Sequence, residues 1–163
     1  MLDVYWLRRR DLDLHSILCK YVDAPELTRD ANGKPQLVGG AVHFNASHSG
    51  ELALVAVSDV PVGVDIERQR AIADPVAFAR RLQFETTDPH ELMRLWCRKE
   101  AWLKARGIGL AGVTQRMDLR GWFVADLEIA AGYSAAVARA GSPTEICVID
   151  WSGDAVIARK IST

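Results

Sequence analysis

Residues 62–67 read VGVDIE, and the apolar and acidic side chains of this stretch alternate. Successive side chains of a β-strand point to opposite faces, so Asp65 and Glu67 are expected on one face and the valine and isoleucine side chains on the other. An apolar run at residues 52–57 and a proline-containing turn precede this stretch. We therefore predict a hairpin whose second strand has one face in the core and one acidic face that lines a polar cleft.

A second charged stretch, WCRKEAWLK at residues 96–104, lies in a region with helical spacing of apolar residues. We predict a long helix over residues 90–106, which ends at the glycine that follows. Glu100 and Lys104 are four residues apart, so they share one face of this helix. If that face meets the acidic strand, three carboxylates and an ammonium converge, and such a group suits a hard divalent cation and a phosphate.

Lys99 falls inside the apolar stripe that we predict for this helix. With about 100° of rotation per residue, the stripe consists of Leu92, Leu95, Trp96, Trp102 and Leu103. A lysine in this stripe needs water or an anion for its ammonium, because burial without a partner is unfavourable. Two interpretations stay open. Either Lys99 extends to water beside an ordinary Glu100–Lys104 pair, or these three charges border a functional site.

The polar cluster NASHS at residues 45–49 follows a short apolar strand that we expect at residues 42–45. Small hydroxyl side chains, backbone amides and a histidine at the end of a strand can bind phosphate oxygens, which makes Ser47 and His48 candidates for this role. The alternative interpretation is a polar turn with a capping serine. A nucleophilic serine is not favoured, because the Gly-x-Ser-x-Gly motif is absent.

Short helices and strands are expected in the rest of the chain. They are helices at residues 11–22 and 75–82, a turn at residues 30–35, and late strands at residues 122–124, 135–138 and 146–151. Two apolar hairpins with proline-containing turns, at residues 52–66 and 135–150, resemble each other and suggest a duplicated half. The predicted fold class is therefore α+β, with an N-terminal half at residues 1–70 and a C-terminal half at residues 71–163.

Composition excludes several classes of function. The 163 residues include 20 basic and 21 acidic side chains, with a formal net charge of −1, so the basic excess of a general nucleic-acid binder is missing. No apolar run reaches the roughly 20 residues of a membrane helix, and the N-terminus lacks a signal-peptide pattern. Cys19, Cys97 and Cys147 do not have metal-ligand spacing. We expect a cytoplasmic protein that binds neither nucleic acid nor membranes.

Four motifs occur in the order found in 4′-phosphopantetheinyl transferases of the broad-specificity, surfactin-synthetase-activating (Sfp-like) class. They are GKP at residues 33–35, FNASHS at residues 44–49, GVDIE at residues 63–67, and WCRKEAWLK at residues 96–104 followed by GIGL. A late GYSAAVA at residues 132–138 also fits. The chain resembles this family from about residue 8 to residue 150.

The resemblance implies an enzyme that transfers the 4′-phosphopantetheine arm of coenzyme A to a serine hydroxyl of an apo carrier protein of the acyl, peptidyl or polyketide type. Adenosine 3′,5′-bisphosphate is then released, and Mg²⁺ is the cofactor. The family fold has two similar α/β halves related by a pseudo-twofold axis. Each half is a small antiparallel sheet packed by a long helix, and the site lies between them.

The resemblance also implies a role for each matching residue. Mg²⁺ would be bound by Asp65, Glu67 and Glu100, and Glu100 would also take the proton of the carrier serine. Lys104 would neutralise the transferring phosphate, and Lys99 would face the pyrophosphate or support Glu100. The positions implied in coenzyme A binding are Lys34, Ser47, His48, Lys99 and Lys104.

The chain departs from the family pattern in its length. Few residues precede the GKP motif, so we expect a shortened N-terminal half that lacks its first strand. The segment between Glu67 and Trp96, which helps to bind the carrier protein in relatives, is also short. One of Arg8, Arg9 and Arg10 matches a coenzyme-contacting position. Two alternatives stay open: a non-catalytic relative that binds carrier protein or coenzyme A, and a metal-dependent hydrolase of nucleotide pyrophosphates.

Overall fold

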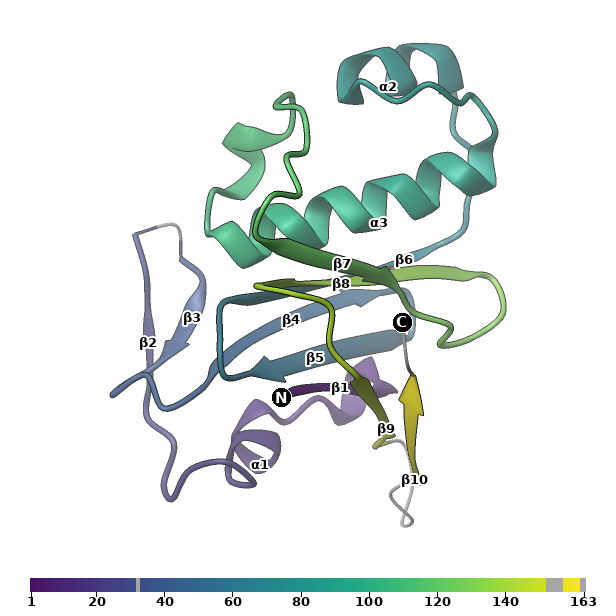
Figure 1. The fold of residues 1–163 in the computed structure, drawn as a ribbon. Helices are drawn as coiled ribbons and strands as arrows, with labels where there is room; N and C mark the ends of the chain where they lie inside the picture. Colours follow the sequence, from purple (N-terminus) through teal and green to yellow (C-terminus); the bar gives the residue numbers. More distant parts are fainter. Residues whose placement is uncertain (32, 152–156, 162–163) are drawn as a thin grey trace.

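Two β-sheets that pack face to face form the centre of the protein (Figure 1). The computed structural model describes residues 1–31, 33–151 and 157–161. The five-stranded sheet has the order β10-β9-β1-β5-β4 and consists of β1 (Leu2–Arg8), β4 (His43–Ser49), β5 (Leu52–Ser58), β9 (Ile146–Asp150) and β10 (Ile157–Ile161). The three-stranded sheet has the order β6-β8-β7 and consists of β6 (Val62–Arg68), β7 (Trp122–Asp126) and β8 (Tyr133–Ala140).

The remaining elements cover these sheets or connect their strands. A separate hairpin pairs β2 (Leu27–Arg29) with β3 (Pro35–Leu37). The helices are α1 (Leu14–Leu18), α2 (Pro75–Leu82), α3 (Pro89–Arg106) and two short 3-10 helices, η1 (Arg9–Asp11) and η2 (Gly109–Gly112). The predicted strands at residues 52–57, 62–67, 122–124, 135–138 and 146–151 and the predicted helix at residues 75–82 all correspond to observed elements. The two predicted hairpins are wrong, however, because β5 and β6 lie in different sheets, as do β8 and β9, so each proline-containing turn connects the two sheets and does not join paired strands. The predicted turn at residues 30–35 joins β2 to β3, although Asn32 lies outside the described residues.

The layers follow the order α1, five-stranded sheet, three-stranded sheet and α3 (Figure 1). Val4 and Leu54 of the first sheet meet Val64, Ile66 and Val137 of the second in the core between them. This mixture of helices and sheets confirms the α+β class. Among the described residues, no helix is long and apolar enough to cross a membrane.

The two predicted halves share their strands. The C-terminal strand β9 pairs with β1, and β6, from the N-terminal range, pairs with β8. Each sheet therefore contains strands from both sides of the predicted boundary at residue 70. The pseudo-twofold relation between the halves and their boundary stay predictions.

The strand β1 corrects the expectation that the first strand is missing. It pairs antiparallel with β5, from Leu2 opposite Ser58 to Arg8 opposite Leu52, and parallel with β9. Both of its faces are covered, one by the core between the sheets and one by the core around α1. A strand buried on both faces does not show the alternation of apolar and polar residues that identifies a strand in a sequence.

The helix predicted at residues 11–22 is also corrected, because α1 covers only Leu14–Leu18. Asp13 has an extended backbone, and its side chain accepts a hydrogen bond from Ser16 N at 3.2 Å, which starts a new helix at this point. After α1, the Tyr21 hydroxyl donates to Asp3 Oδ2 at 2.6 Å. This contact holds the chain against β1, so the apolar spacing after Leu18 does not continue as a helix.

The predicted long helix is confirmed as α3, and its two ends have the expected caps. Asp88 accepts a hydrogen bond from Glu91 N at 2.8 Å at the start, and Gly107 has a φ of 69° at the end. The face that packs on the three-stranded sheet differs from the predicted apolar stripe. Leu95 and Trp96 are only half-buried.

Small side chains form the contact between α3 and the sheet below it. The cluster at this contact contains Cys97, Ala101 and Ala105 of α3 with Ala136 and Ala138 of β8. A Cβ atom added to Gly63 of β6 would lie 2.1 Å from Ala101 O and 2.4 Å from Ala105 N. The absence of a side chain at Gly63 therefore lets the backbone of α3 approach β6 closely.

Replacement of Gly63 by alanine is expected to lower the free energy of unfolding by roughly 1–3 kcal/mol or more, because the added methyl group meets backbone atoms that cannot rotate away. Urea unfolding followed by circular dichroism measures this change. Val76→Ala on the exposed surface of α2 is the control and should stay within about 0.5 kcal/mol of the wild type. A Gly63→Ala protein as stable as the wild type would show that α3 and β6 are not held at this distance.

Candidate active site

Asp65 and Glu67 project from one face of β6, as their spacing predicts. Val64 and Ile66 on the other face enter the core between the sheets. The acidic face lies below α3, and Asp65 is only 3% exposed, whereas Glu67 is half-buried. The common acidic face is therefore confirmed, but α3 covers Asp65, which does not lie on an open cleft wall.

Lys104 of α3 forms the closest charged contact with this face. Its Nζ lies 2.6 Å from Asp65 Oδ1 and 3.1 Å from Ser47 Oγ, and the Ser47 hydroxyl donates to the same Asp65 oxygen at 2.8 Å. Each of the three groups, the ammonium, the hydroxyl and the carboxylate, thus contacts the other two. The sequence predicted that charged side chains of the helix contact the acidic strand, and the structure shows this contact for Lys104 and Asp65.

Glu100 lies one helical turn before Lys104 and adds a third carboxylate. Its Oε1 atom is buried without a hydrogen-bond partner among the described residues, as is Asp65 Oδ2. Burial is the main cause that raises the pKa of Glu100 above its ordinary value; Lys104 opposes this rise, and the negative charges of Asp65 and Glu67 add to it. The three carboxylates therefore repel one another, and the pKa of Glu100 reflects this.

The polar cluster of residues 45–49 lies within β4 and not after it, which corrects the predicted end of this strand. Ser47 contacts Asp65, and Ser49, two residues later, donates to Glu67 Oε2 at 3.0 Å. His48 lies between them in the strand, so its side chain points to the opposite face, where it is exposed. Ser47 and His48 were predicted together as coenzyme contacts, and the structure places them on different faces.

Two residues near the site were missed by the sequence analysis. Ser49 was part of a quoted motif without a role, although its spacing of two from Ser47 places both hydroxyls on one face. Cys97 is fully buried, and its thiol donates to Ser134 O at 3.2 Å. Burial and the negative charge of Asp65 raise its pKa, so Cys97 stays a neutral thiol next to the carboxylates. Cys97 lies three residues before Glu100, and this spacing was the signal by which the sequence could have placed it near the carboxylates.

Lys99 faces away from the carboxylates. It is 1% exposed, and its ammonium donates to Leu82 O at 2.9 Å and lies 5.5 Å from the centre of the Phe84 ring. Burial lowers its pKa. Leu82 is the last residue of α2, so Lys99 satisfies a free carbonyl at that helix end, where a positive charge is favoured. It does not extend to water, and this position supports a structural role next to Glu100.

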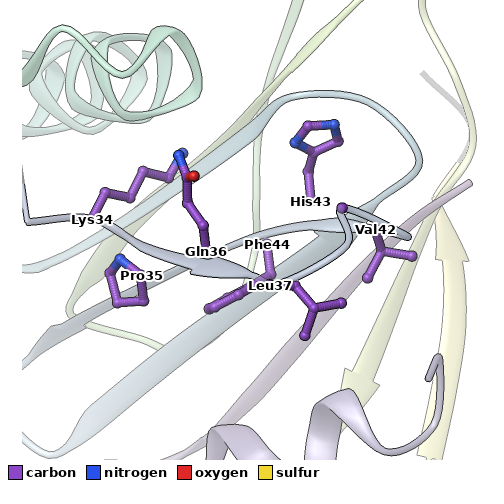
Figure 2. A pocket seen from close by; sticks show the side chains of 8 residues that line it. Lys34, Pro35, Gln36, Leu37, Val42, His43 and Phe44 are labelled. Carbon is purple, nitrogen blue, oxygen red and sulfur yellow. The ribbon is translucent and has the colours of Figure 1, made fainter. Parts of the chain in front are cut away.

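Lys34 connects the β2–β3 hairpin to the end of α3. Its ammonium donates to Lys104 O at 2.7 Å and to Val62 O at 3.3 Å. Burial lowers its pKa, and the nearby charge of Lys104 contributes to this shift. Figure 2 shows the pocket that it helps to line, with a volume of about 130 Å³, where Lys34, just before β3, and Gln36 of β3 extend to the same side as His43 of β4.

A larger cavity of about 520 Å³ lies at the end of β1, and its lining residues are Arg8, Arg9, Arg10 and Glu51. All four side chains are exposed. The three guanidinium groups place several positive charges together at this cavity, which suits an anionic group. The resemblance placed a coenzyme contact among these arginines.

The oxygens of Asp65, Glu67 and Glu100 suit a hard cation such as Mg²⁺, which prefers oxygen ligands. Two buried carboxylate oxygens without partners and the mutual repulsion of the three groups support this fit. In the part of the chain that the structure describes, however, no three His, Cys, Asp or Glu side chains are arranged as a metal centre. The ligand chemistry fits, but the side chains are not assembled around one point, and Lys104 neutralises part of their charge.

Comparison with known proteins connects this site to a family. The family model described as the 4′-phosphopantetheinyl transferase superfamily matches residues 61–158, which include β6 and α3. The 4′-phosphopantetheinyl transferase psf-1 of Bacillus pumilus is 38% identical over 92 residues, which are 50% of this chain and 40% of the relative. The transferase Sfp of Bacillus subtilis strain 168 is 33% identical over 81 residues, 42% of this chain and 35% of the relative.

A longer but weaker match is the 4′-phosphopantetheinyl transferase ffp of Bacillus subtilis. It is 28% identical over 136 residues, which are 67% of this chain and 61% of the relative. The matches with these three relatives thus cover between 35% and 61% of the relatives' own lengths.

Replacement of Lys104 by methionine is expected to lower the free energy of unfolding by roughly 1–3 kcal/mol, because the nearly buried Asp65 loses its cation. The double variant with Asp65→Asn should lose less than the sum of the two single variants, with a coupling of about 0.5–3 kcal/mol. Urea titrations of the four proteins measure this cycle. Arg94→Met, which breaks an exposed pair with Asp126, is the control and should change stability by less than about 1 kcal/mol. Additive losses would contradict the Lys104–Asp65 contact.

Proposed function

The chain belongs to the 4′-phosphopantetheinyl transferase superfamily, and from this premise we propose that it transfers the 4′-phosphopantetheine arm of coenzyme A to a serine hydroxyl of an apo carrier protein. The acceptor is a carrier of the acyl, peptidyl or polyketide type, and adenosine 3′,5′-bisphosphate leaves. The observation that carries this proposal is the approach of Glu100 and Lys104 of α3 to Asp65 and Glu67 of β6. We propose a cytoplasmic location for the reaction.

The reaction exchanges the phosphoanhydride bond of coenzyme A for a phosphodiester bond to the carrier serine. The oxygen of the carrier serine attacks the phosphorus that bears the pantetheine arm, and the bond from this phosphorus to the oxygen of the adenosine bisphosphate breaks. The bonding electrons leave with that oxygen, and the serine proton moves to Glu100, directly or through a water molecule. Glu100 suits this role because its buried carboxylate has a raised pKa and therefore holds a proton more readily than an exposed glutamate does.

Asp65, Glu67 and Glu100 are the proposed ligands of Mg²⁺. Bound Mg²⁺ would neutralise charge on the pyrophosphate oxygens and so favour departure of the adenosine bisphosphate. Mg²⁺ is usually bound by one or two carboxylates together with phosphate and water, so the three groups need not all be direct ligands. Lys104, which contacts Asp65 in this structure, would pair with the transferring phosphate when Asp65 binds the cation, so its ammonium would stay paired with an anion.

The remaining polar residues are proposed contacts of coenzyme A. Ser47 lies between Asp65 and Lys104, next to the place where the phosphate would bind. Lys34 borders the pocket shown in Figure 2, and the exposed His48 is available to the 3′-phosphate. Since Lys99 is bound to a carbonyl of α2, we propose that it supports the helix that carries Glu100 and does not touch the pyrophosphate.

Transfer is tested by incubation of the protein with coenzyme A, Mg²⁺ and a panel of apo carrier proteins, followed by mass spectrometry of the carriers. We expect at least one carrier to gain the mass of the 4′-phosphopantetheine arm, and no gain when EDTA replaces Mg²⁺. Coenzyme A binding without any mass gain would instead indicate a non-catalytic relative. Release of free phosphopantetheine without a carrier would indicate a hydrolase.

Glu100→Gln is expected to keep the fold but to lower turnover by about 10²–10⁴-fold, because the amide cannot take the serine proton. The same carrier assay gives the rate, and circular dichroism confirms the fold. Glu91→Gln, at the exposed start of the same helix, is the matched control and should keep the wild-type rate. A Glu100→Gln protein with near-normal turnover would remove Glu100 from the proposed roles.

A further inference from the structure

β4 and β6 are edge strands of two different sheets, and no ladder of backbone hydrogen bonds joins them. Side chains of β4 connect them instead. The three that bind β6 are Asn45, Ser47 and Ser49. Since they alternate along the strand, they share one face. Two of them are serines, and each donates its hydroxyl proton to one carboxylate of the candidate metal site.

The hydroxyl of Ser49 has a defined direction. Its oxygen accepts a hydrogen bond from Arg68 N at 3.0 Å, and the same hydroxyl donates to Glu67 Oε2 at 3.0 Å. A serine has a single hydroxyl proton, and the backbone amide already occupies a lone pair, so the proton is left for the carboxylate. The backbone of β6 thus orients the hydroxyl that in turn orients Glu67, one residue earlier in the same strand.

The charged partner of Glu67 is Arg70, and its contact is weaker than that of the Ser49 hydroxyl. Arg70 Nη1 lies 3.8 Å from Glu67 Oε2, and the Arg70 side chain is 68% exposed. An exposed ion pair at this distance holds a side chain only loosely. Among the described residues, Ser49 is therefore the close, directional partner of a carboxylate that is half-buried beside Glu100 and Asp65.

We infer that Ser49 is a positioning residue, which holds one oxygen of Glu67 so that the carboxylate is kept in place for a divalent cation. This inference rests on the proposed function, in which Glu67 is a ligand of Mg²⁺. Hydrogen bonds to ligating carboxylates fix their orientation, and loss of such a partner typically lowers metal affinity by about 10–100-fold. Ser47 donates to Asp65 in a comparable way, but Lys104 also binds that Asp65 oxygen. Ser49 is therefore the position where the effect of a serine hydroxyl on a carboxylate can be measured separately from the effect of a lysine.

Binding of Mn²⁺ as a probe for Mg²⁺, measured by electron paramagnetic resonance on the full chain, tests the inference without an activity assay. Ser49→Ala is expected to weaken Mn²⁺ binding by about 10–100-fold, and Ser49→Thr, which keeps the hydroxyl, should bind nearly as well as the wild type. Ser49→Val is matched in shape to Ser49→Thr and should bind as weakly as Ser49→Ala. Ser16→Ala removes a serine that donates to an exposed carboxylate elsewhere, Asp13, and should leave binding unchanged.

Thermal unfolding without metal separates positioning from a merely structural role. Equal Mn²⁺ affinity in the Thr and Val variants would overturn the inference, whatever their stability, and this comparison holds even if Ser49→Ala does not fold. Loss of stability in Ser49→Val without loss of affinity would also overturn it and leave the proposed function intact. A wild-type protein that does not bind Mn²⁺ would instead overturn the proposed metal role, and the role of Ser49 with it.

Discussion

The open edge of β6 is the constraint on which the site depends. A buried strand edge needs partners for its backbone groups, because unpaired buried N–H and C=O groups are strongly unfavourable. Here side chains supply them: the partners are Asn45 for Val64 N, Ser49 for Arg68 N, Lys104 for Val64 O and Lys34 for Val62 O. These side chains come from three separate parts of the fold, so the hairpin, β4 and α3 are all held at this edge. The candidate site lies where these elements meet.

The distance between α3 and β6 is the second constraint. Gly63 and the alanines around it let the helix backbone lie close to the strand. Because α3 lies so close to β6, the side chain of Lys104 can contact Asp65, with 2.6 Å between Lys104 Nζ and Asp65 Oδ1. Larger side chains at this contact would hold the helix farther away, and the carboxylates of the helix and of the strand would no longer influence one another. Packing of small residues therefore sets the electrostatics of the site.

The parts of the fold that local spacing controls were predictable from the sequence. The alternation at residues 62–67 placed Asp65 and Glu67 correctly on one face, and the helical spacing and caps gave α3. The partners of Lys99 and Lys34 were not predictable, because Leu82 O and Lys104 O are backbone groups whose positions depend on the tertiary fold. The buried face of α3 was predicted wrongly in part, since large apolar residues were given more weight than Cys97 and Ala101.

The position of β1 has a consequence for how the chain acquires its structure. β1 lies between β5 and β9, so its second neighbour is a segment that is synthesised late, at Ile146–Asp150. Until β9 is synthesised, one edge of the apolar strand β1 has no partner. A long loop must also close before β1 and β9 can pair, and this requirement makes folding slow. A ribosome-bound intermediate would therefore expose this edge to other chains, which favours aggregation. Protection by a chaperone during synthesis would matter more for this protein than for one built from neighbouring hairpins.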